Sequence, residues 1–535
     1  MLSLLLLAQA AAAAAFDFDV LVYGATPAGV LAADAAAGEG ATVALLDPRG
    51  VVGGAIAGGL CETDIGTTTA VIGGRARKFF EQVAAHYNKS GQLYAFEPFV
   101  AEAVFRDYFL ASKPALTLSL FTRIANLEVA DGAITRAVLA NGSALTARVF
   151  VDASYEGWLL PMAGVDFTYG REASETFGER DAGVLDPSNP VWTPAHPYVA
   201  QHQLAPPLRA PYFPNGSAVP FITPAPPAPA GGADAVTMQA YAFRTTLTTN
   251  ASNMLQPWPR PDGYDPARFE LVRLAIAQGG LADFRSVVGL GGALPNEKFD
   301  NNNHMFGQFP GLSWPYPAAV AANDWAAQEA VWAEHRAAYL GLFYFLATDP
   351  RLPPGFASGA REVGLPLDEY AALGHFPGAL YVRECLRLVA DFVFTQREFE
   401  GGGGAHADSV AMGAYSIDIM HHSRFVNGSG WVVEEGGIQG PSFLNKTVPP
   451  FQVPFRALVP KRGQAKNLLV PVALSASHVG FNAVRLEPTW MPLGESAGVA
   501  AAQLARNATS GAAVQELDTA VLTARLRQLG QVLSL

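Results

Sequence analysis

Residues 18–47 limit the fold more tightly than any other stretch of the sequence. Residues Phe18–Tyr23 have the apolar character of a buried strand, Pro27–Ala37 is an alanine-rich segment typical of a helix, and Thr42–Asp47, "TVALLD", is typical of a second strand. Parallel strands require a crossover connection, which is usually a helix. The stretch therefore predicts a βαβ unit, from which open α/β sheets are built.

The turn "VLVYGATPAG", residues 20–29, has part of a dinucleotide-binding pattern. Gly24 and Gly29 take the first and third glycine positions of GxGxxG, but Thr26 takes the second, where its Cβ leaves less room for a pyrophosphate. Thr26 is also a good N-cap and Pro27 a good first helical residue. A helix N-terminus offers free N–H groups to a phosphate. The turn alone fits either a nucleotide site or a plain strand-to-helix turn.

Further residues that suit a nucleotide follow the second strand. Asp47 closes that strand, where an acidic side chain accepts hydrogen bonds from ribose hydroxyls, although a solvated strand end would look the same. Paired glycines come next, at Gly53-Gly54 and Gly58-Gly59. Such pairs let the backbone lie close to a flat ligand.

A β-meander is expected in the next part of the chain. Helical patterns cover Arg75–His86 and Pro98–Ala111. Three short strands follow, separated by Asp131-Gly132 and Asn141-Gly142, which tolerate the positive φ of two-residue hairpins. They lead into a strand at Arg148–Ala153.

The middle of the chain combines loops with amphipathic helices. Residues 181–235 are rich in proline and glycine, which predicts a long surface loop. Amphipathic helices are expected at residues 269–278 and 323–347. "GGGGA" at 401–405 predicts a hinge or loop.

Composition narrows the classes of partner. A chain of 535 residues that is half apolar can bury more than one core, which favours two domains. A net charge of −12 disfavours nucleic acid and anionic membranes and favours a small-molecule or carbohydrate substrate. Cys61 and Cys385 are the two cysteines, too few for a disulfide scaffold or a multi-cysteine zinc site. The histidines have no HxxxH spacing, so we expect no metal. Oligomeric state is left open.

Several features point to the secretory pathway. Residues 1–15, "MLSLLLLAQAAAAAA", have the apolar region and small residues of a cleaved signal peptide, although a short anchor or an alanine-rich helix would fit them too. Seven Asn-x-Ser/Thr sequons predict an N-glycosylated protein that is extracellular or lumenal. They begin at Asn88, Asn141, Asn215, Asn250, Asn427, Asn445 and Asn507. Since no later run reaches about 18 apolar residues, we expect no membrane association after cleavage.

Long motifs at both ends resemble one known family. They include "DVLVYGATPAGVLAADAAAGEGATVALLD", "VDASYEGWLLPMAGVDFTYGRE" and the stretch from "VPFRALVPKRG" to "EPTWMPLGESAGVAAAQLA". Over residues 17–506 the chain is similar to FAD-dependent oxidoreductases of the glutathione-reductase-like fold, in the branch called xanthan lyase-like. In that family "YGATPAG" is a variant of the phosphate loop, so the resemblance favours a nucleotide at this turn.

The resemblance implies an α/β fold: a discontinuous, Rossmann-like FAD-binding domain with a β-meander, and an inserted α+β substrate domain. The FAD-binding domain would span residues 16–160 and 446–535, and the substrate or cap domain residues 161–445. FAD would contact the phosphate loop, the end of the second strand, the glycine pair, the strand before "VDAS" and the last helix, which "GESAG" would open beneath the flavin. These residues are Gly24, Thr26, Ala28, Gly29, Asp47, Gly53, Gly54, Asp152, Met491, Gly494, Ala497 and Gly498.

The chain departs from the family pattern at two places. The family's "YEGDL" is "YEGWL" here, with Trp158 in place of an acidic residue. The family usually has serine and histidine after the aspartate of "YSIDIMHHSR", where this chain has Ile419 and Met420. Asp418 and His421 remain candidates for the site.

Candidate catalytic residues lie near the expected flavin-facing helix. His478 can take a proton near neutral pH as hydride leaves the substrate, and Arg485 can clamp a carboxylate or steady an oxyanion. Asp418, His421 and Arg456 complete the set, although Arg456 could instead pair with Glu487. Arg383 lies in "YVRECLRL", which an ordinary amphipathic helix would also explain.

Together these features predict a secreted FAD-dependent oxidase that acts on a C–OH or C–N bond of a small molecule or sugar. "VVGLGGAL" at 287–294 lacks the spacing of a second dinucleotide site, so oxygen is the expected electron acceptor. Three alternatives remain at this point. They are an FAD dehydrogenase with another acceptor, a secreted flavin-binding protein without activity, and an NAD-dependent reductase that uses the Gly24 turn.

Overall fold

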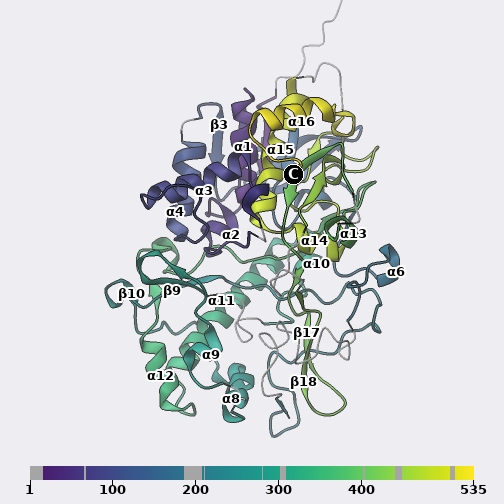
Figure 1. Cartoon of the computed structure of the whole chain (residues 1–535). Helices are drawn as coiled ribbons and strands as arrows, with labels where there is room; N and C mark the ends of the chain where they lie inside the picture. Colours follow the sequence, from purple (N-terminus) through teal and green to yellow (C-terminus); the bar gives the residue numbers. More distant parts are fainter. Residues whose placement is uncertain are drawn as a thin grey trace, which may run out of the picture.

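Both ends of the chain meet in one part of the molecule. The computed structural model describes residues 16–65, 68–111, 113–185, 208–209, 211–279, 281–301, 309–401, 404–439, 449–506 and 513–535. In Figure 1 the purple N-terminal elements and the yellow C-terminal elements lie side by side, while much of the teal middle of the chain forms the opposite end of the molecule. The signal-peptide prediction for residues 1–15 lies outside the described residues.

A five-stranded parallel sheet forms the centre of the first part. Its order is β21-β7-β1-β2-β3, so the last strand in sequence lies at one edge, beside β7. The βαβ prediction is confirmed, because β1 and β2 pair in parallel with Val20 opposite Val43. The strands are β1 (Phe18–Tyr23), β2 (Val43–Leu46), β3 (Leu116–Ser119), β7 (Ala147–Asp152) and β21 (Leu468–Leu469).

Two buried helices pack tightly on each other beside this sheet. Helix α1 (Pro27–Gly38) joins β1 to β2, and α15 (Glu487–Arg506) comes from the other end of the chain. A Cβ on Gly494 would lie 2.1 Å from the Ala28 carbonyl oxygen, and one on Gly498 would lie 2.1 Å from that of Ala32. The two glycines, one helical turn apart, let the helices approach this closely.

The predicted meander and the helices predicted at Arg75–His86 and Pro98–Ala111 are present, together with further helices that were not predicted. The meander is β4 (Ile124–Ala130), β5 (Ala133–Leu139) and β6 (Ala144–Leu145), antiparallel throughout. The helices are α2 (Gly54–Ala57), α3 (Gly74–His86), α4 (Pro98–Ala103) with a wider helical turn at Val104–Leu110, α5 (Leu159–Met162), α14 (His478–Val484) and α16 (Thr519–Gln528).

The middle of the chain is built around one long helix and a small antiparallel sheet. Helix α11 (Trp325–Thr348) covers the predicted 323–347 segment, and α8 (Glu270–Ala277) covers 269–278. The small sheet is β11 (Ala293–Leu294), β12 (Lys298–Asn301) and β9 (Thr245–Thr248). The other helices of the middle of the chain are α6 (Ser174–Phe177), α9 (Phe284–Val288), α10 (Tyr316–Ala321), α12 (Pro354–Arg361) and α13 (Gln396–Phe399).

Five antiparallel strand pairs complete the strands of the described residues. They are β10 (Met254–Leu255) with β13 (Leu365–Pro366), β14 (Arg387–Leu388) with β8 (Phe167–Thr168), β15 (Ser409–Gly413) with β20 (Phe451–Pro454), β16 (Asp418–Ile419) with β19 (Ile438–Gln439), and β17 (Ser423–Val426) with β18 (Val432–Glu435). The domain boundaries at residues 160 and 445 stay a prediction.

The predicted loop at 181–235 lies partly outside the described residues. Its described parts, at 181–185, 208–209 and 211–235, contain turns and isolated bridges rather than helices or paired strands. Within the described part of the chain, no helix is both long and apolar enough to span a bilayer.

Candidate functional site

The phosphate loop is shaped by its two glycines and by Thr26. Gly24 has φ +104°, and a Cβ there would lie 2.8 Å from the Ser154 nitrogen. Thr26 Oγ1 accepts the Gly29 amide hydrogen at 3.1 Å and donates to the Ala153 carbonyl at 2.7 Å. Strand β1 therefore turns directly into the N-terminus of α1, which presents its free helical N–H groups at the carboxyl end of the strand.

Asp47 fastens this loop to the end of β2. Its Oδ2 accepts the Ala25 amide at 2.7 Å, and its Oδ1 accepts the Arg49 amide at 2.7 Å. Burial raises the pKa of Asp47 to about 6. Each oxygen keeps a second lone pair, so the predicted ribose contact stays open while the carboxylate already holds the loop.

Sequence reasoning missed Arg49, which lies next to the same loop. Its guanidinium stacks on Trp332 at 3.3 Å from the ring centroid, and Nη1 donates to Glu329 at 2.9 Å. Its Nε and Nη2 are buried and have no hydrogen-bond partner. The available signal was its position, two residues beyond Asp47 at the carboxyl end of a strand.

A cavity and a wider cleft meet at Arg49. The cavity, about 40 Å³, is lined by Gly24, Thr26 and Asp47, and the cleft, about 780 Å³, opens beside it. Both are lined by Arg49 and Trp332. Orphaned guanidinium nitrogens on a residue that lines the same cavity as Thr26 fit the pyrophosphate of a dinucleotide, which needs donors and positive charge. The cavity itself is too small for a dinucleotide, so side chains around it must move when one binds.

The glycine pair after β2 packs on the phosphate loop. The Gly53 amide donates to the Ala25 carbonyl at 2.7 Å, and a Cβ on Gly54 would lie 3.1 Å from the Thr26 Cα and 2.5 Å from the Tyr155 hydroxyl oxygen. Tyr155 thus covers Gly54. The predicted contact of Gly53 and Gly54 with FAD requires Tyr155 to move or to contact the cofactor itself.

Tyr155 also contacts the start of α15. Its hydroxyl accepts the Ala55 amide at 2.9 Å and donates to Glu487 Oε1 at 2.5 Å. Burial raises the pKa of Glu487 to about 8, and its Oε2 has no hydrogen-bond partner. The first residue of α15 is thus a buried carboxyl group that holds its proton at neutral pH.

The prediction that "GESAG" opens the last helix is wrong. Helix α15 begins at Glu487, so Met491, Gly494, Ala497 and Gly498 lie inside it and are buried. Gly494 and Gly498 serve the close packing on α1 described above. The helix end whose N–H groups could face a flavin is therefore the turn that starts at Glu487.

Asp152 holds the turn after β7. Its Oδ1 accepts from the Ser154 amide at 3.1 Å and hydroxyl at 2.6 Å, and its Oδ2 accepts the Leu159 amide at 2.7 Å. Burial raises its pKa to about 6. In this structure Asp152 shapes the segment that lines the loop cavity. Trp158 in that segment donates through Nε1 to Gln328 at 2.9 Å.

His478, the first residue of α14, is held by a carboxylate. Its Nδ1 lies 2.9 Å from Glu384 Oε2, and both side chains are buried. Burial alone would raise the pKa of Glu384, but its interactions with His478 and Arg387 lower it to about 2. Asn482 Nδ2 donates to the same carboxylate at 3.1 Å. Glu384 was not among the predicted site residues.

Arg485 and Asp418 are brought together as an ion pair. Arg485 Nη2 lies 2.9 Å from Asp418 Oδ2, and Nη1 donates to the Tyr381 hydroxyl at 2.7 Å. Arg485 Nε donates to Asn482 Oδ1 at 2.8 Å. Asn482 therefore links this pair to the carboxylate that holds His478.

The other two candidates do not join this arrangement. His421 lies 3.5 Å from Glu434, and burial with help from Arg424 lowers its pKa to about 3, so it is neutral at pH 7. Arg456 has a side chain that is 44% exposed and pairs with Asp408. The predicted pairing of Arg456 with Glu487 is wrong, because Glu487 is bound to Tyr155.

Two further observations concern groups that bind metals or react. No cluster of three or more His, Cys, Asp or Glu suited to a metal occurs within the residues that the structure covers. Both cysteines are buried, and burial raises the pKa of the Cys61 thiol. Cys61 donates to the Gly59 carbonyl at 2.9 Å.

Comparison with solved structures finds partial matches. Aquifex aeolicus GidA is 19% identical, with 26% of this chain and 25% of that one covered and a TM-score of 0.22. Thermovibrio ammonificans THI4 is 18% identical, covering 29% and 66% with a TM-score of 0.22. Thioredoxin reductase from T. acidophilum is 17% identical, covering 29% and 36% with a TM-score of 0.17. The chain thus spans about a quarter of the length of GidA.

The family comparison covers nearly the whole chain. No curated protein matches the sequence. The FAD dependent oxidoreductase family matches residues 19–526, from the second residue of β1 into α16. The match spans the phosphate loop, the Arg49 cavity and the start of α15. The chain therefore belongs to the FAD dependent oxidoreductase family, and it is an enzyme whose cofactor is FAD.

Proposed function

We propose that this enzyme is a secreted oxidase that removes hydride from a C–OH or C–N bond of a small molecule or sugar. The observation that carries the proposal is the buried pair of His478 and Glu384, with 2.9 Å between Nδ1 and Oε2. His478 begins the segment that runs through Arg485 into Glu487, the first residue of α15, and Glu384 holds it from another part of the chain. A base, a cation and a helix N-terminus thus follow one another within ten residues of chain.

The residues that would hold FAD are those of the loop cavity. Thr26 and the first turn of α1 would bind the pyrophosphate with Arg49, whose Nε and Nη2 are without partners. Asp47 would bind the adenosine ribose through its remaining lone pairs. FAD, when bound, accepts the hydride that the substrate gives up.

His478 would take the proton that leaves with the hydride. Its Nδ1 is held by Glu384, which fixes the ring orientation and leaves Nε2 to accept a proton. Glu384 keeps its negative charge at neutral pH because its pKa lies near 2. A carboxylate in this position stabilises the protonated imidazole that forms during the reaction.

Arg485 would steady negative charge on the reacting oxygen or nitrogen. Its own charge is balanced by Asp418, and its orientation is fixed by Tyr381 and Asn482. A guanidinium held by three partners needs little reorganisation to stabilise developing charge. This role assigns Asp418 to positioning, since it reaches the substrate only through Arg485.

Secretion and glycosylation are part of the proposal. The support is the sequence of residues 1–15 and the placement of the described sequons. Asn141 and Asn215 are exposed and Asn250 is half-buried. In each of these sequons the serine two residues on donates its hydroxyl hydrogen to the asparagine Oδ1. Asn88 is exposed and Asn427 half-buried, while Asn445 and Asn507 lie outside the described residues. The test is to express the protein in a eukaryotic secretion host and to measure the mass of the secreted protein before and after glycosidase treatment. We expect the mass to fall.

The test of the reaction uses purified holoenzyme and two readouts. A panel of sugars, alcohols, amines and hydroxy acids is screened for bleaching of the flavin absorbance without oxygen and for hydrogen peroxide in air. Substrate-dependent peroxide is the expected result. If a substrate bleaches the flavin and an artificial dye reoxidises it but air does not, the enzyme is a dehydrogenase and not an oxidase. Flavin that no member of the panel bleaches would argue against both.

A further inference from the structure

Three buried arginines surround the ring of Tyr381. The guanidinium carbons of Arg244, Arg383 and Arg485 lie 5.7, 4.8 and 5.8 Å from its centroid. The arginines are 3%, 1% and 1% exposed. Three positive charges in one buried place require compensation, because desolvation of an unpaired ion is strongly unfavourable.

Two of these arginines have carboxylate partners and the third has none. Arg244 pairs with Asp300, and Arg485 pairs with Asp418 at 2.9 Å. Arg383 Nη1 donates to the Ala240 carbonyl at 2.5 Å, and Nη2 is buried without a hydrogen-bond partner. Throughout the described ranges no carboxylate lies within 4 Å of Arg383.

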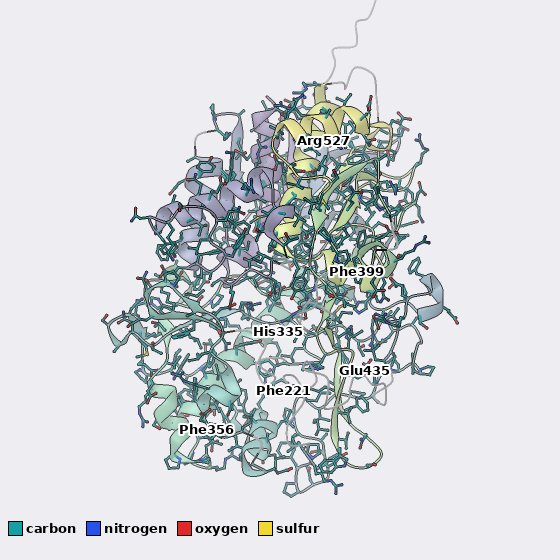
Figure 2. The ribbon with its side chains drawn as sticks, viewed as in Figure 1. Phe221, His335, Phe356, Phe399, Glu435 and Arg527 are labelled. Carbon is teal, nitrogen blue, oxygen red and sulfur yellow. The ribbon has the colours of Figure 1, made fainter. Side chains whose placement is uncertain are left out.

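Among the described residues, no neighbouring group forms an ion pair with Arg383. Burial lowers the pKa of His421 to about 3 and that of His335 to about 4, so both are uncharged at pH 7. His335, labelled in Figure 2 on α11, lies near the middle of the molecule. Burial also lowers the pKa of Arg383, to about 10, which leaves it charged at neutral pH. Asp64, half-buried, acts on Arg244 and Arg485, and the charge of Asp418 reaches Arg383 while its ion pair is with Arg485.

We propose that Arg383 binds a carboxylate of the substrate, so that the substrates of this oxidoreductase are monocarboxylic acids. This inference rests on the proposed function and names its substrate class. Arg383 is the one arginine of the three without an ion pair, which matches a monoanion, whereas a phosphate dianion would need a second unpaired cation. The Tyr381 hydroxyl accepts its bond from Arg485, which leaves its own hydrogen to donate to the second carboxylate oxygen.

The position of Arg383 agrees with a role beside the reacting atoms. Tyr381 is shared between Arg383 and Arg485, and Arg485 is linked through Asn482 to the carboxylate that holds His478. A carboxylate anchored at Arg383 would therefore place the rest of the substrate beside Arg485. Arg485 itself is already neutralised by Asp418 and serves less well as the carboxylate anchor.

A purely structural role for Arg383 makes a different prediction. If the Tyr381 ring and the Ala240 carbonyl are its only partners, replacing it by an apolar residue of similar length leaves binding unchanged and is neutral or stabilising. Arg336 offers a matched control in the same part of the chain. It lies 4.6 Å from the Phe376 ring, with Nη2 3.4 Å from the Leu373 carbonyl oxygen, and it is half-buried.

The experiment measures carboxylate binding to holoenzyme rather than turnover. Benzoate and acetate are compared with benzamide and acetamide and with inorganic phosphate, by calorimetric titration and by the shift in melting temperature. The wild-type protein, Arg383→Met, Arg383→Lys and Arg336→Met are compared. We expect the carboxylates alone to bind the wild type, with affinity about 10-fold or more weaker in Arg383→Met and unchanged in Arg336→Met.

Several results would overturn the proposal. It fails if neither carboxylate binds the wild type, if the amides or phosphate bind equally well, or if Arg383→Met binds as the wild type does. Should Arg383→Met not fold, Arg383→Lys decides, because loss of the planar guanidinium should still weaken binding and an unchanged affinity would reject the site. Failure of the proposed function shows separately, as carboxylate binding without bleaching or peroxide.

Discussion

The hydroxyl of Tyr155 donates to Oε1 of Glu487 at 2.5 Å, joining residues 332 positions apart in the sequence. The same hydroxyl accepts the Ala55 amide, so one side chain connects the glycine-rich turn after β2 with the first residue of α15.

Tyr155→Phe removes the hydroxyl that bonds both the Ala55 amide and Glu487, and these two groups stay buried. We expect the free energy of unfolding to fall by about 1–3 kcal/mol, as measured by chemical denaturation. Tyr212→Phe, at an exposed residue, is the control, and equal losses in both would contradict the interpretation.

Glu487 gives the enzyme a pH-dependent stability. Burial raises its pKa to about 8 from an ordinary 4.5, so the folded state keeps a proton that the unfolded chain releases between these values. This contribution to stability is complete below pH 4.5 and is lost as the pH rises through 8. Glu487→Gln should reduce the fall in unfolding free energy between pH 5 and 8 by up to about 4 kcal/mol. Parallel pH curves for wild type and variant would reject this, and Glu516→Gln, at an exposed position, serves as the control.

The contact between α1 and α15 tolerates no added methyl group. Gly494→Ala would place a Cβ 2.1 Å from the Ala28 carbonyl oxygen, and we expect a loss of about 1–3 kcal/mol or more. Gly355→Ala in α12 adds the same atom in open space and should stabilise the protein by about 0.5–1 kcal/mol. Melting temperatures of the two variants must therefore shift in opposite directions.

Arg49 is expected to hold FAD. Arg49→Met keeps the stacking volume on Trp332 but removes the cation beside the phosphate loop. The flavin-to-protein absorbance ratio after gel filtration should fall, with FAD affinity reduced about 10-fold or more. Arg136→Met, in an exposed pair with Glu128, should keep its flavin. Full flavin retention by Arg49→Met would remove Arg49 from the cofactor site.

His478 is expected to control the chemical step. His478→Gln should lower kcat by about 10²–10⁴-fold while the flavin content stays unchanged. Glu384→Gln should have a smaller effect on kcat and should shift the pH profile of kcat, since the imidazolium would lose its negative partner. His86→Gln, at an exposed position, is the control. A His478→Gln variant with normal kcat would assign the proton transfer to another group.

Local patterns in the sequence were enough to predict the first part of the fold. The strand at 18–23, the helix that starts at Pro27 and the meander all follow from hydrophobic period and turn chemistry, which depend on neighbours in sequence. The start of α15 was missed because the resemblance placed it at "GESAG", whereas the helix begins at Glu487 and continues through Pro492. Packing on α1 overrides the lost hydrogen bond there, and no local pattern contains that contact.

Long-range contacts also decided the candidate site. Arg485 and Asp418 were both predicted, but their pairing joins elements 67 residues apart. Arg383 was compatible with an amphipathic helix, whereas residues 379–388 contain no helix and Arg383 is buried by partners such as Ala240, 143 residues away. In the sequence Arg49 looks like an ordinary surface arginine, because its burial depends on contact with Trp332 of α11, far along the chain.

The place of β21 at the edge of the parallel sheet bears on how the chain folds during synthesis. Its residues 468 and 469 pair with β7, which the ribosome delivers more than 300 residues earlier. For most of its translation the growing polypeptide therefore has an incomplete parallel sheet, in which the β7 edge has no paired strand. A shortened gene that ends before β21 should yield an aggregating product instead of an autonomous flavin-binding fragment.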